Sequence, residues 1–160
     1  MTRKDFLNKA ILIKGEIINY CNIIEFLTNY YLSSNVIMKN TFFGMAVINK
    51  LNFNDKIKIL KAILSENEND YLRKYPDLIS NINTIQQLRN KFAHSIFSIE
   101  QAEDYSKLDR FTMMKTEKFD ANDFEKTEYK ISSHHKNVDI FMNVIKEVCE
   151  IAELSTDIGQ

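Results

Sequence analysis

The sequence has few of the residues that break a helix or crosslink a chain. Its 160 residues include three glycines, one proline and two cysteines, and there is no tryptophan. So few glycines and prolines leave room for long helices. Cys21 and Cys149 are far apart in the sequence, and neither has a partner at a characteristic spacing. This pattern argues against a disulfide scaffold or a cysteine-based metal site, and it favours a reducing cytoplasm.

The sequence also lacks an excess of charge and a long apolar run. Lys and Arg number 21 and Asp and Glu 22, so the net charge of −1 creates no field that attracts phosphate or a membrane. Any contact with nucleic acid must therefore be local. Near the N-terminus, charged residues interrupt the apolar ones at Asp5, Lys9, Lys14 and Glu16. We therefore expect neither a signal peptide nor a membrane span, and a soluble cytoplasmic protein without membrane contact.

What the chain has in quantity is apolar residues at helical spacing. Hydrophobic residues make up 44% of the sequence, enough for one continuous core, so we expect residues 1–160 to form a single domain. The first apolar series recurs every three or four positions: Ala10, Ile13, Ile17, Cys21, Ile24, Leu27 and Tyr31. This period predicts a long helix over 5–32, and we expect the polar residues 33–35 to end it.

Similar patterns predict the rest of the fold. Further helices are expected over 41–51, from 54 or 55 to 64, over 76–95, and from Ser132 or Ser133 onward. Segments 111–115 and 127–131 have the composition of short strands around the polar stretch 117–123, which predicts a hairpin. The expected fold class is therefore all-α, an antiparallel bundle of four to five helices with a small appended β-hairpin.

The helix expected over 76–95 carries the most distinctive stretch of the sequence. Its apolar stripe consists of Leu78, Ile82, Ile85, Leu88, Phe92 and Ile96. At about 100° per residue, Arg89 falls at the edge of this stripe, whereas Asn90 and His94 fall on the outer side, one turn apart. Histidine exchanges protons near neutral pH, and a guanidinium stays charged and grips phosphate oxygens. RNA cleavage without a metal needs these two groups, and Asn90 is a candidate to orient the imidazole or the phosphate.

The segment Arg89-Asn90-Lys91-Phe92-Ala93-His94 resembles the R-x4-H motif of the HEPN superfamily. The members are small α-helical proteins that include many prokaryotic ribonucleases and toxins. The resemblance implies a HEPN-like domain that acts as a metal-independent RNA endonuclease without a cofactor, with Arg89, Asn90 and His94 as catalytic residues. It also implies products with a 2′,3′-cyclic phosphate, a dimer in which two motifs face each other, and an antitoxin or another protein as a partner.

The same stretch is similar to part of some proteins of the mannitol operon repressor family. That similarity implies a non-catalytic transcriptional regulator or interaction module, which is the main alternative. No DNA-reading helix-turn-helix or basic stripe is visible, so such a regulator would act through a protein partner. A simpler alternative leaves His94 as an ordinary surface residue and pairs Arg89 with a carboxylate. Glu25 is one candidate for that pairing, although it can also face solvent.

The spacing of Arg89 and His94 indicates whether one chain can form the site alone. Five residues turn an ideal helix by about 140°, so Arg89 and His94 of one chain do not converge easily on one phosphate. A two-fold interface would let Arg89 of one chain meet His94 of another. We therefore expect a homodimer with a composite Arg/His site, with Gln86, Asn90 and His94 near the two-fold axis.

Lysines are the candidates for contacts to RNA phosphates, and an ordinary solvated surface is their alternative role. The candidates are Lys50, Lys56, Lys58, Lys61 and Lys91. The adjacent His134 and His135 invite comparison with a metal site. Neighbours in sequence rarely aim both rings at one ion, and no His or Cys stands one helical turn away from them. We therefore expect no metal site.

Overall fold

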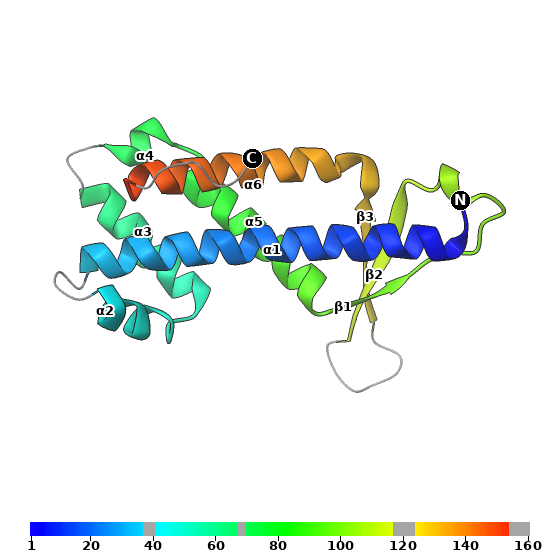
Figure 1. The fold of residues 1–160 in the computed structure, drawn as a ribbon, viewed down its shortest axis with the longest axis horizontal. Helices are drawn as coiled ribbons and strands as arrows, with labels where there is room; N and C mark the ends of the chain where they lie inside the picture. The colour runs from blue at the N-terminus through cyan, green and yellow to red at the C-terminus, as the bar shows by residue number, and fades with distance from the viewer. Residues whose placement is uncertain (37–40, 67–69, 117–123, 154–160) are drawn as a thin grey trace. The chain divides into compact units, whose positions relative to one another are not determined.

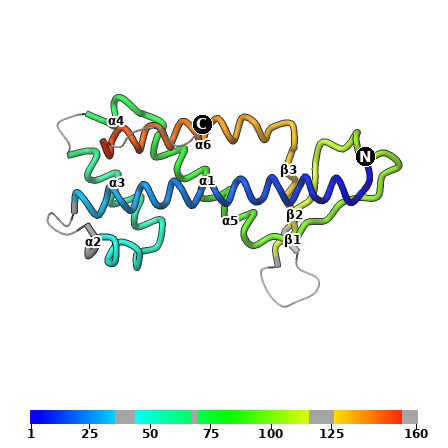
Figure 2. Tube along the Cα trace, in the orientation of Figure 1, coloured from blue at the N-terminus to red at the C-terminus, as the bar shows by residue number. Residues whose placement is uncertain are grey.

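The computed structural model describes residues 1–36, 41–66, 70–116 and 124–153 (Figures 1 and 2). The helices are α1 (Arg3–Val36), α2 (Thr41–Ile48), α3 (Phe53–Glu66), α4 (Tyr71–Lys74), α5 (Leu78–Ala93) and α6 (His134–Ile151). Short 3₁₀ turns cover Tyr105–Lys107 and Ile131–Ser133, and the strands are β1 (Ser95–Ser98), β2 (Arg110–Thr116) and β3 (Phe124–Lys130). The described chain is thus mainly helical with one small antiparallel sheet, as predicted in outline. The antiparallel helical bundle remains a prediction.

The chain divides into two compact units. The first contains Met1–Tyr20 and Gln86–Asp139, and the second contains Cys21–Ile85 and Ile140–Gln160. Helices α1, α5 and α6 each contribute residues to both units. The expectation of a single domain stays a prediction. None of the helices in the described ranges combines the length and the apolar character needed to cross a bilayer.

In the first unit, α1 begins with a reciprocal cap. The backbone N–H of Asp5 donates to Thr2 Oγ1 at 3.2 Å, and the Asp5 carboxylate accepts from the backbone N–H of Thr2 at 3.0 Å. This exchange satisfies donors that the first turn leaves free. The hydrogen bonds from Thr2 also lower the pKa of the Asp5 carboxyl. Behind the cap, Ala10, Ile13 and Ile17 of the predicted stripe are buried, and Phe6, which was not part of that prediction, is buried as well.

The first unit also contains the whole sheet, in the order β1-β2-β3. The predicted hairpin is present as β2 and β3, with Phe111 opposite Tyr129. Strand β1 was not predicted, because Ile96 continues the helical spacing of the stripe before it. The assignment of Ile96 to the apolar stripe of the helix was wrong. The helix ends at Ala93, and Ile96 lies in β1 with 65% of its side chain exposed.

An aromatic cluster joins the last turn of α5 to the sheet. The ring of Phe92 lies edge-on to that of Tyr129 with centroids 5.0 Å apart, and also contacts Phe97 and Phe111 at 6.3 Å each. Phe92 is completely buried. Such edge-to-face packing is favourable for aromatic quadrupoles and leaves little freedom for the ring. The end of α5 is therefore held against the sheet.

In the second unit, the stripes of several helices form the core. Its buried residues include Ile24, Leu27, Ile57, Leu60, Leu64, Leu78, Ile82, Ile85, Val144, Ile145 and Val148. Glycine allows a close approach of α2 to α1, because a Cβ at Gly44 would lie 2.9 Å from both the Cβ and the carbonyl oxygen of Ser33. Cys21 donates to the carbonyl of Ile85 at 3.8 Å and is therefore part of the helix packing.

Several predicted helix ends were displaced. Helix α1 continues to Val36, because Ser33 and Ser34 donate back to the carbonyl of Tyr30, and Asn35 donates to that of Tyr31. Short polar side chains in a last turn can bond to the preceding turn instead of ending the helix.

Three other boundaries differ. Helix α2 ends at Ile48, and α3 begins at Phe53, where Asn52 accepts from the backbone N–H of Asp55 at 3.0 Å and so caps the helix. Helix α5 begins at Leu78, so Pro76 lies in the turn before the helix. The short helix α4 was not predicted.

Candidate functional site

The motif lies where α5 passes into the sheet of the first unit. Asn90 and His94 are exposed and Arg89 is half-buried, as the helical projection predicted. The backbone N–H of His94 donates to the carbonyl of Asn90 at 3.3 Å, the last helical hydrogen bond of this segment. His94 itself is in the turn, and β1 begins at the next residue. The imidazole therefore stands at an edge of the helix that is accessible to a ligand.

An open pocket of about 450 Å³ surrounds this turn. It is lined by Gln87, Asn90, Lys91, His94 and Lys115. Lys115 comes from β2, and it reaches the pocket because Ser95 pairs with Lys115 across the two strands. None of the described residues that line the pocket is acidic, whereas two are lysines. The described lining therefore provides hydrogen-bond donors that suit a phosphate group, from the lysines and the amides of Gln87 and Asn90. In the strand register, Lys115 stands opposite Glu125 of β3.

Two contacts hold the residue after His94 in place. The Lys14 ammonium donates to the backbone carbonyl of Ser95 at 3.4 Å and lies 5.4 Å from the centre of the Phe97 ring. The Ser95 hydroxyl donates to the carbonyl of Lys91 at 2.5 Å. Since Ser95 is buried, these contacts fix the start of β1 to both α1 and the end of α5.

Arg89 does not line the pocket of its own chain. Arg89 makes no ion pair and no side-chain hydrogen bond with any described residue. The carboxylate partner that the simpler alternative requires is therefore not among the described residues. Glu25 pairs with Lys56 at 2.8 Å instead, which sequence reasoning did not consider. The neighbouring amide of Gln86 donates to Asn90 Oδ1 over a long 3.5 Å, a weak contact that orients Asn90.

The five candidate lysines are divided between the two units, with Lys91 in the first and the other four in the second. Lys91 is exposed and lines the pocket. Lys50, Lys58 and Lys61 are exposed residues of the second unit and do not line it, and Lys58 pairs with Asp55 at 3.0 Å. The Lys56 side chain is only 3% exposed and is held by Glu25. The Lys56 ammonium is therefore buried in an ion pair within the second unit.

A second polar cluster in the first unit was not anticipated from the sequence. His134 Nε2 lies 2.6 Å from Glu16 Oε2, and His134 Nδ1 lies 3.0 Å from the Tyr129 hydroxyl, which also accepts from Asn137 at 2.9 Å. The Tyr129 hydroxyl accepts from Asn137 and has one proton that it can donate to Nδ1; in that tautomer the proton on Nε2 faces Glu16. Burial raises the pKa of Tyr129, and the bond from Asn137 partly offsets this rise.

This cluster ties α1, β3 and α6 together within the first unit. Both ring nitrogens of His134 are occupied, so this histidine serves the fold, whereas the side chain of His94 makes no hydrogen bond to any described residue. His135 is exposed. Across the described ranges, no group of three or more His, Cys, Asp or Glu side chains is arranged to hold a metal ion.

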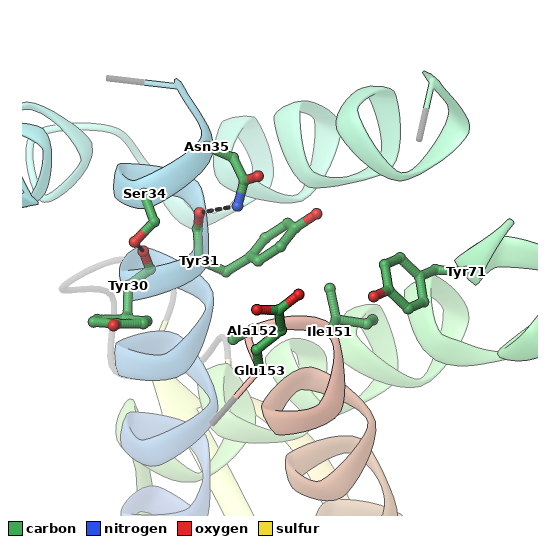
Figure 3. Close-up of a pocket in the computed structure, with 8 residues that line it drawn as sticks. All are labelled: Tyr30, Tyr31, Ser34, Asn35, Tyr71, Ile151, Ala152 and Glu153. Atoms are coloured by element: carbon green, nitrogen blue, oxygen red, sulfur yellow. Dashed lines mark hydrogen bonds between the residues drawn. The ribbon is translucent and has the colours of Figure 1, made fainter. Parts of the chain in front are cut away.

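The second unit contains a pocket of about 350 Å³ of a different character (Figure 3). It is lined by Tyr30, Tyr31, Ser34, Asn35, Tyr71, Ile151, Ala152 and Glu153. Figure 3 shows the first four projecting from the end of α1. No Lys, Arg or His is among the described residues that line it, and one glutamate is. It is therefore poorly suited to a phosphate, and the pocket at His94 is the better candidate.

Comparisons of the chain with models of protein families, with curated proteins and with solved structures gave no match.

Proposed function

We propose that the protein is a metal-independent RNA endonuclease in which His94 is the proton acceptor. The observation that carries the proposal is the pocket that gathers the exposed His94 with Asn90 and Lys91. A histidine beside cations is the arrangement that a strand cleavage by an internal hydroxyl requires. The resemblance of the Arg89–His94 segment to the HEPN motif supports the same reaction.

The proposed reaction cleaves one phosphodiester bond of the RNA. His94 takes the proton of a ribose 2′-hydroxyl, the 2′-oxygen bonds to the adjacent phosphorus, and the bond from phosphorus to the 5′-oxygen breaks. The leaving 5′-oxygen takes a proton from water, and the protonated His94 returns its proton to the hydroxide so formed. The products carry a 2′,3′-cyclic phosphate and a 5′-hydroxyl. Cations near the phosphate stabilise the charge that develops on its oxygens, and Asn90 orients the imidazole or the phosphate.

Arg89 enters the proposed site from a second copy of the chain. Within one chain it is half-buried and does not line the pocket, although its guanidinium is the cation best shaped for phosphate. A homodimer with Gln86, Asn90 and His94 near the two-fold axis would bring Arg89 of one chain toward His94 of the other. In this proposal the protein needs no cofactor, and an antitoxin or another protein would restrain its activity.

The decisive experiment is an RNA cleavage assay with the purified full-length protein in the presence of a chelator. Single-stranded or loop RNA should be cut, and His94→Ala should lower the rate by roughly 100-fold because the proton acceptor is lost. His135→Ala is the matched control, since it removes another exposed histidine of the first unit and should cleave like wild type. If the wild-type protein leaves all RNA intact, or if His94→Ala cleaves as fast, the proposal fails. The regulator alternative then takes its place.

A further inference from the structure

We infer that Tyr129 is a positioning residue for His94, the proposed proton acceptor. The inference rests on the proposed function and extends it to the polar cluster around Tyr129. The Tyr129 side chain is only 6% exposed and does not line the pocket at His94, so it acts through residues that lie between the two. The contacts run from the Tyr129 hydroxyl through its ring to Phe92, in the last turn of α5.

The position of the His94 imidazole depends on the backbone on either side of it. The His94 side chain makes no hydrogen bond to any described residue, so no such bond holds the ring. On the C-terminal side, the buried Ser95 accepts from Lys14. On the N-terminal side, Phe92 is the one buried residue of segment 88–94, which the structure describes throughout. A contact that fixes Phe92 therefore fixes the turn of helix that leads into His94.

Tyr129 is the closest described ring partner of Phe92. The two ring centroids lie 5.0 Å apart with an interplanar angle of 84°, whereas the Phe97 and Phe111 centroids lie 6.3 Å from that of Phe92. Edge-to-face packing is favourable only at a defined separation and angle. Because Phe92 is completely buried and protein interiors are closely packed, a shift of the Tyr129 ring displaces the Phe92 side chain.

The Tyr129 ring is held at both of its ends. Its inner end belongs to β3, and its outer end is the hydroxyl, which accepts from the Asn137 amide at 2.9 Å. The hydroxyl also lies 3.0 Å from His134 Nδ1, to which it can donate. Glu16 of α1 holds His134 in turn, through Nε2 at 2.6 Å. The polar cluster thus fixes where the Tyr129 ring meets Phe92.

The test compares Tyr129→Phe with wild type in the full-length protein. This substitution keeps the ring and removes only the hydroxyl that supports its outer end. We expect kcat for RNA cleavage to fall roughly three- to tenfold with KM nearly unchanged, because the imidazole is displaced while the phosphate contacts remain. The NMR signals of the His94 ring should shift in the same variant. The chain has three histidines, so the signals that His94→Ala loses identify this ring.

Tyr105→Phe is the matched control. Tyr105 belongs to the same unit and its ring packs against Phe6 with centroids 6.2 Å apart, but its hydroxyl makes no hydrogen bond to a described residue. Removing this hydroxyl should leave both kcat and the His94 signals as in wild type.

Two substitutions of His134 give an independent measurement. His134→Ala removes the acceptor for the Tyr129 hydroxyl, whereas His134→Asn offers an amide oxygen near the position of Nδ1. Both lose the contact with Glu16 and share its effect on stability, so the contact with Tyr129 is what distinguishes them. His134→Ala should lower kcat and shift the His94 signals as Tyr129→Phe does, and His134→Asn should restore most of both.

The NMR signals separate this inference from the proposed function. If Tyr129→Phe leaves the His94 signals or kcat as in wild type, or if Tyr105→Phe changes them equally, the inference is overturned even where wild type cleaves RNA. If wild type does not cleave RNA but Tyr129→Phe selectively moves the His94 signals, the link between the two residues stands and the nuclease proposal fails. Equal behaviour of the two His134 variants also overturns the inference. If Tyr129→Phe does not fold, these two variants decide the outcome.

Discussion

The ammonium of Lys14 lies 3.4 Å from the backbone carbonyl oxygen of Ser95, the residue that follows His94. The same ammonium lies over the Phe97 ring. A residue on α1 thus holds the start of β1, where the chain leaves the candidate catalytic histidine. This relationship makes Lys14 a positioning residue, since it does not line the pocket itself.

Replacing Lys14 with methionine keeps the stem but removes the donor and the charge. We expect kcat for RNA cleavage to fall about three- to tenfold with KM nearly unchanged, because His94 is less well positioned and the phosphate contacts remain. The ring signals of His94 in NMR spectra should shift. Lys14→Arg should restore most of the rate, and Lys4→Met, an exposed lysine on the same helix, should have no effect. Wild-type kcat in Lys14→Met would contradict the assignment.

A composite site predicts complementation between two inactive variants. Arg89→Ala and His94→Ala should each be inactive, but co-refolding them in equal amounts should restore about a quarter of wild-type activity. Half of the dimers are then mixed, and each mixed dimer has one site with both groups intact. Light scattering checks that the protein is dimeric. A monomer at high micromolar concentration, or a mixture as inactive as its components, would exclude the composite site. The stability of Arg89→Ala must be measured as well, because this side chain is half-buried.

Two glycines in helices should respond to alanine in opposite directions. A Cβ at Gly44 would lie 2.9 Å from atoms of Ser33, so Gly44→Ala should destabilise the fold by about 1–3 kcal/mol. A Cβ at Gly15 meets nothing within 4 Å, and Gly15→Ala in the middle of α1 should stabilise it by about 0.5–1 kcal/mol. Urea unfolding measures both. Equal effects of the two substitutions would show that α1 and α2 do not pack as described.

Asp109 should make stability depend on pH in the acidic range. The side chain and backbone of Ser132 donate to its carboxylate at 2.6 and 2.8 Å, and these bonds lower its pKa below 3.8. A lowered carboxyl pKa adds stability above the unfolded-state value, and this stability is lost as the pH falls through the folded-state value. Asp109→Asn should therefore unfold at lower urea than wild type at pH 7, and the difference should shrink as the pH falls below about 4.

The control for this prediction is Asp139→Asn, which changes an exposed carboxylate of α6 in the same unit. It should follow wild type across the whole pH range. If the free energy of unfolding of Asp109→Asn differed from that of wild type by the same amount down to pH 3, the prediction would be contradicted. The charge of the Asp109 carboxylate would then not be the source of the stability.

The helices and the hairpin could be predicted because their signals are local. Apolar residues at steps of three and four identified α1, α3, α5 and α6, and the hairpin followed from two apolar strands around a polar stretch. Their ends were less predictable. Whether Ser33 and Ser34 end a helix or bond back to Tyr30 depends on the packing of that turn, which spacing alone does not reveal.

The positions of Ile96 and Lys56 were not predicted, because each depends on a residue that is distant in the sequence. Ile96 has the right spacing for a helical stripe, but pairing with Met114 places it on a strand. Lys56 belongs to a lysine-rich segment that has the composition of a solvated surface, but Glu25 on another helix holds it in the interior. Ion pairs and strand pairing join residues that are far apart in the sequence, so a local sequence pattern does not predict them.

The sequence by itself determined that Asn90 and His94 face away from the core, because helical periodicity fixes the direction of each side chain relative to the apolar stripe. It also placed Arg89 at the edge of that stripe, apart from His94. Only the tertiary structure decided which other residues surround His94. The pairing of β1 with β2 brings Lys115 to the pocket, and Lys14 fastens the turn beside it. Both contacts join residues that are far apart in the sequence, so the local pattern around His94 does not determine them.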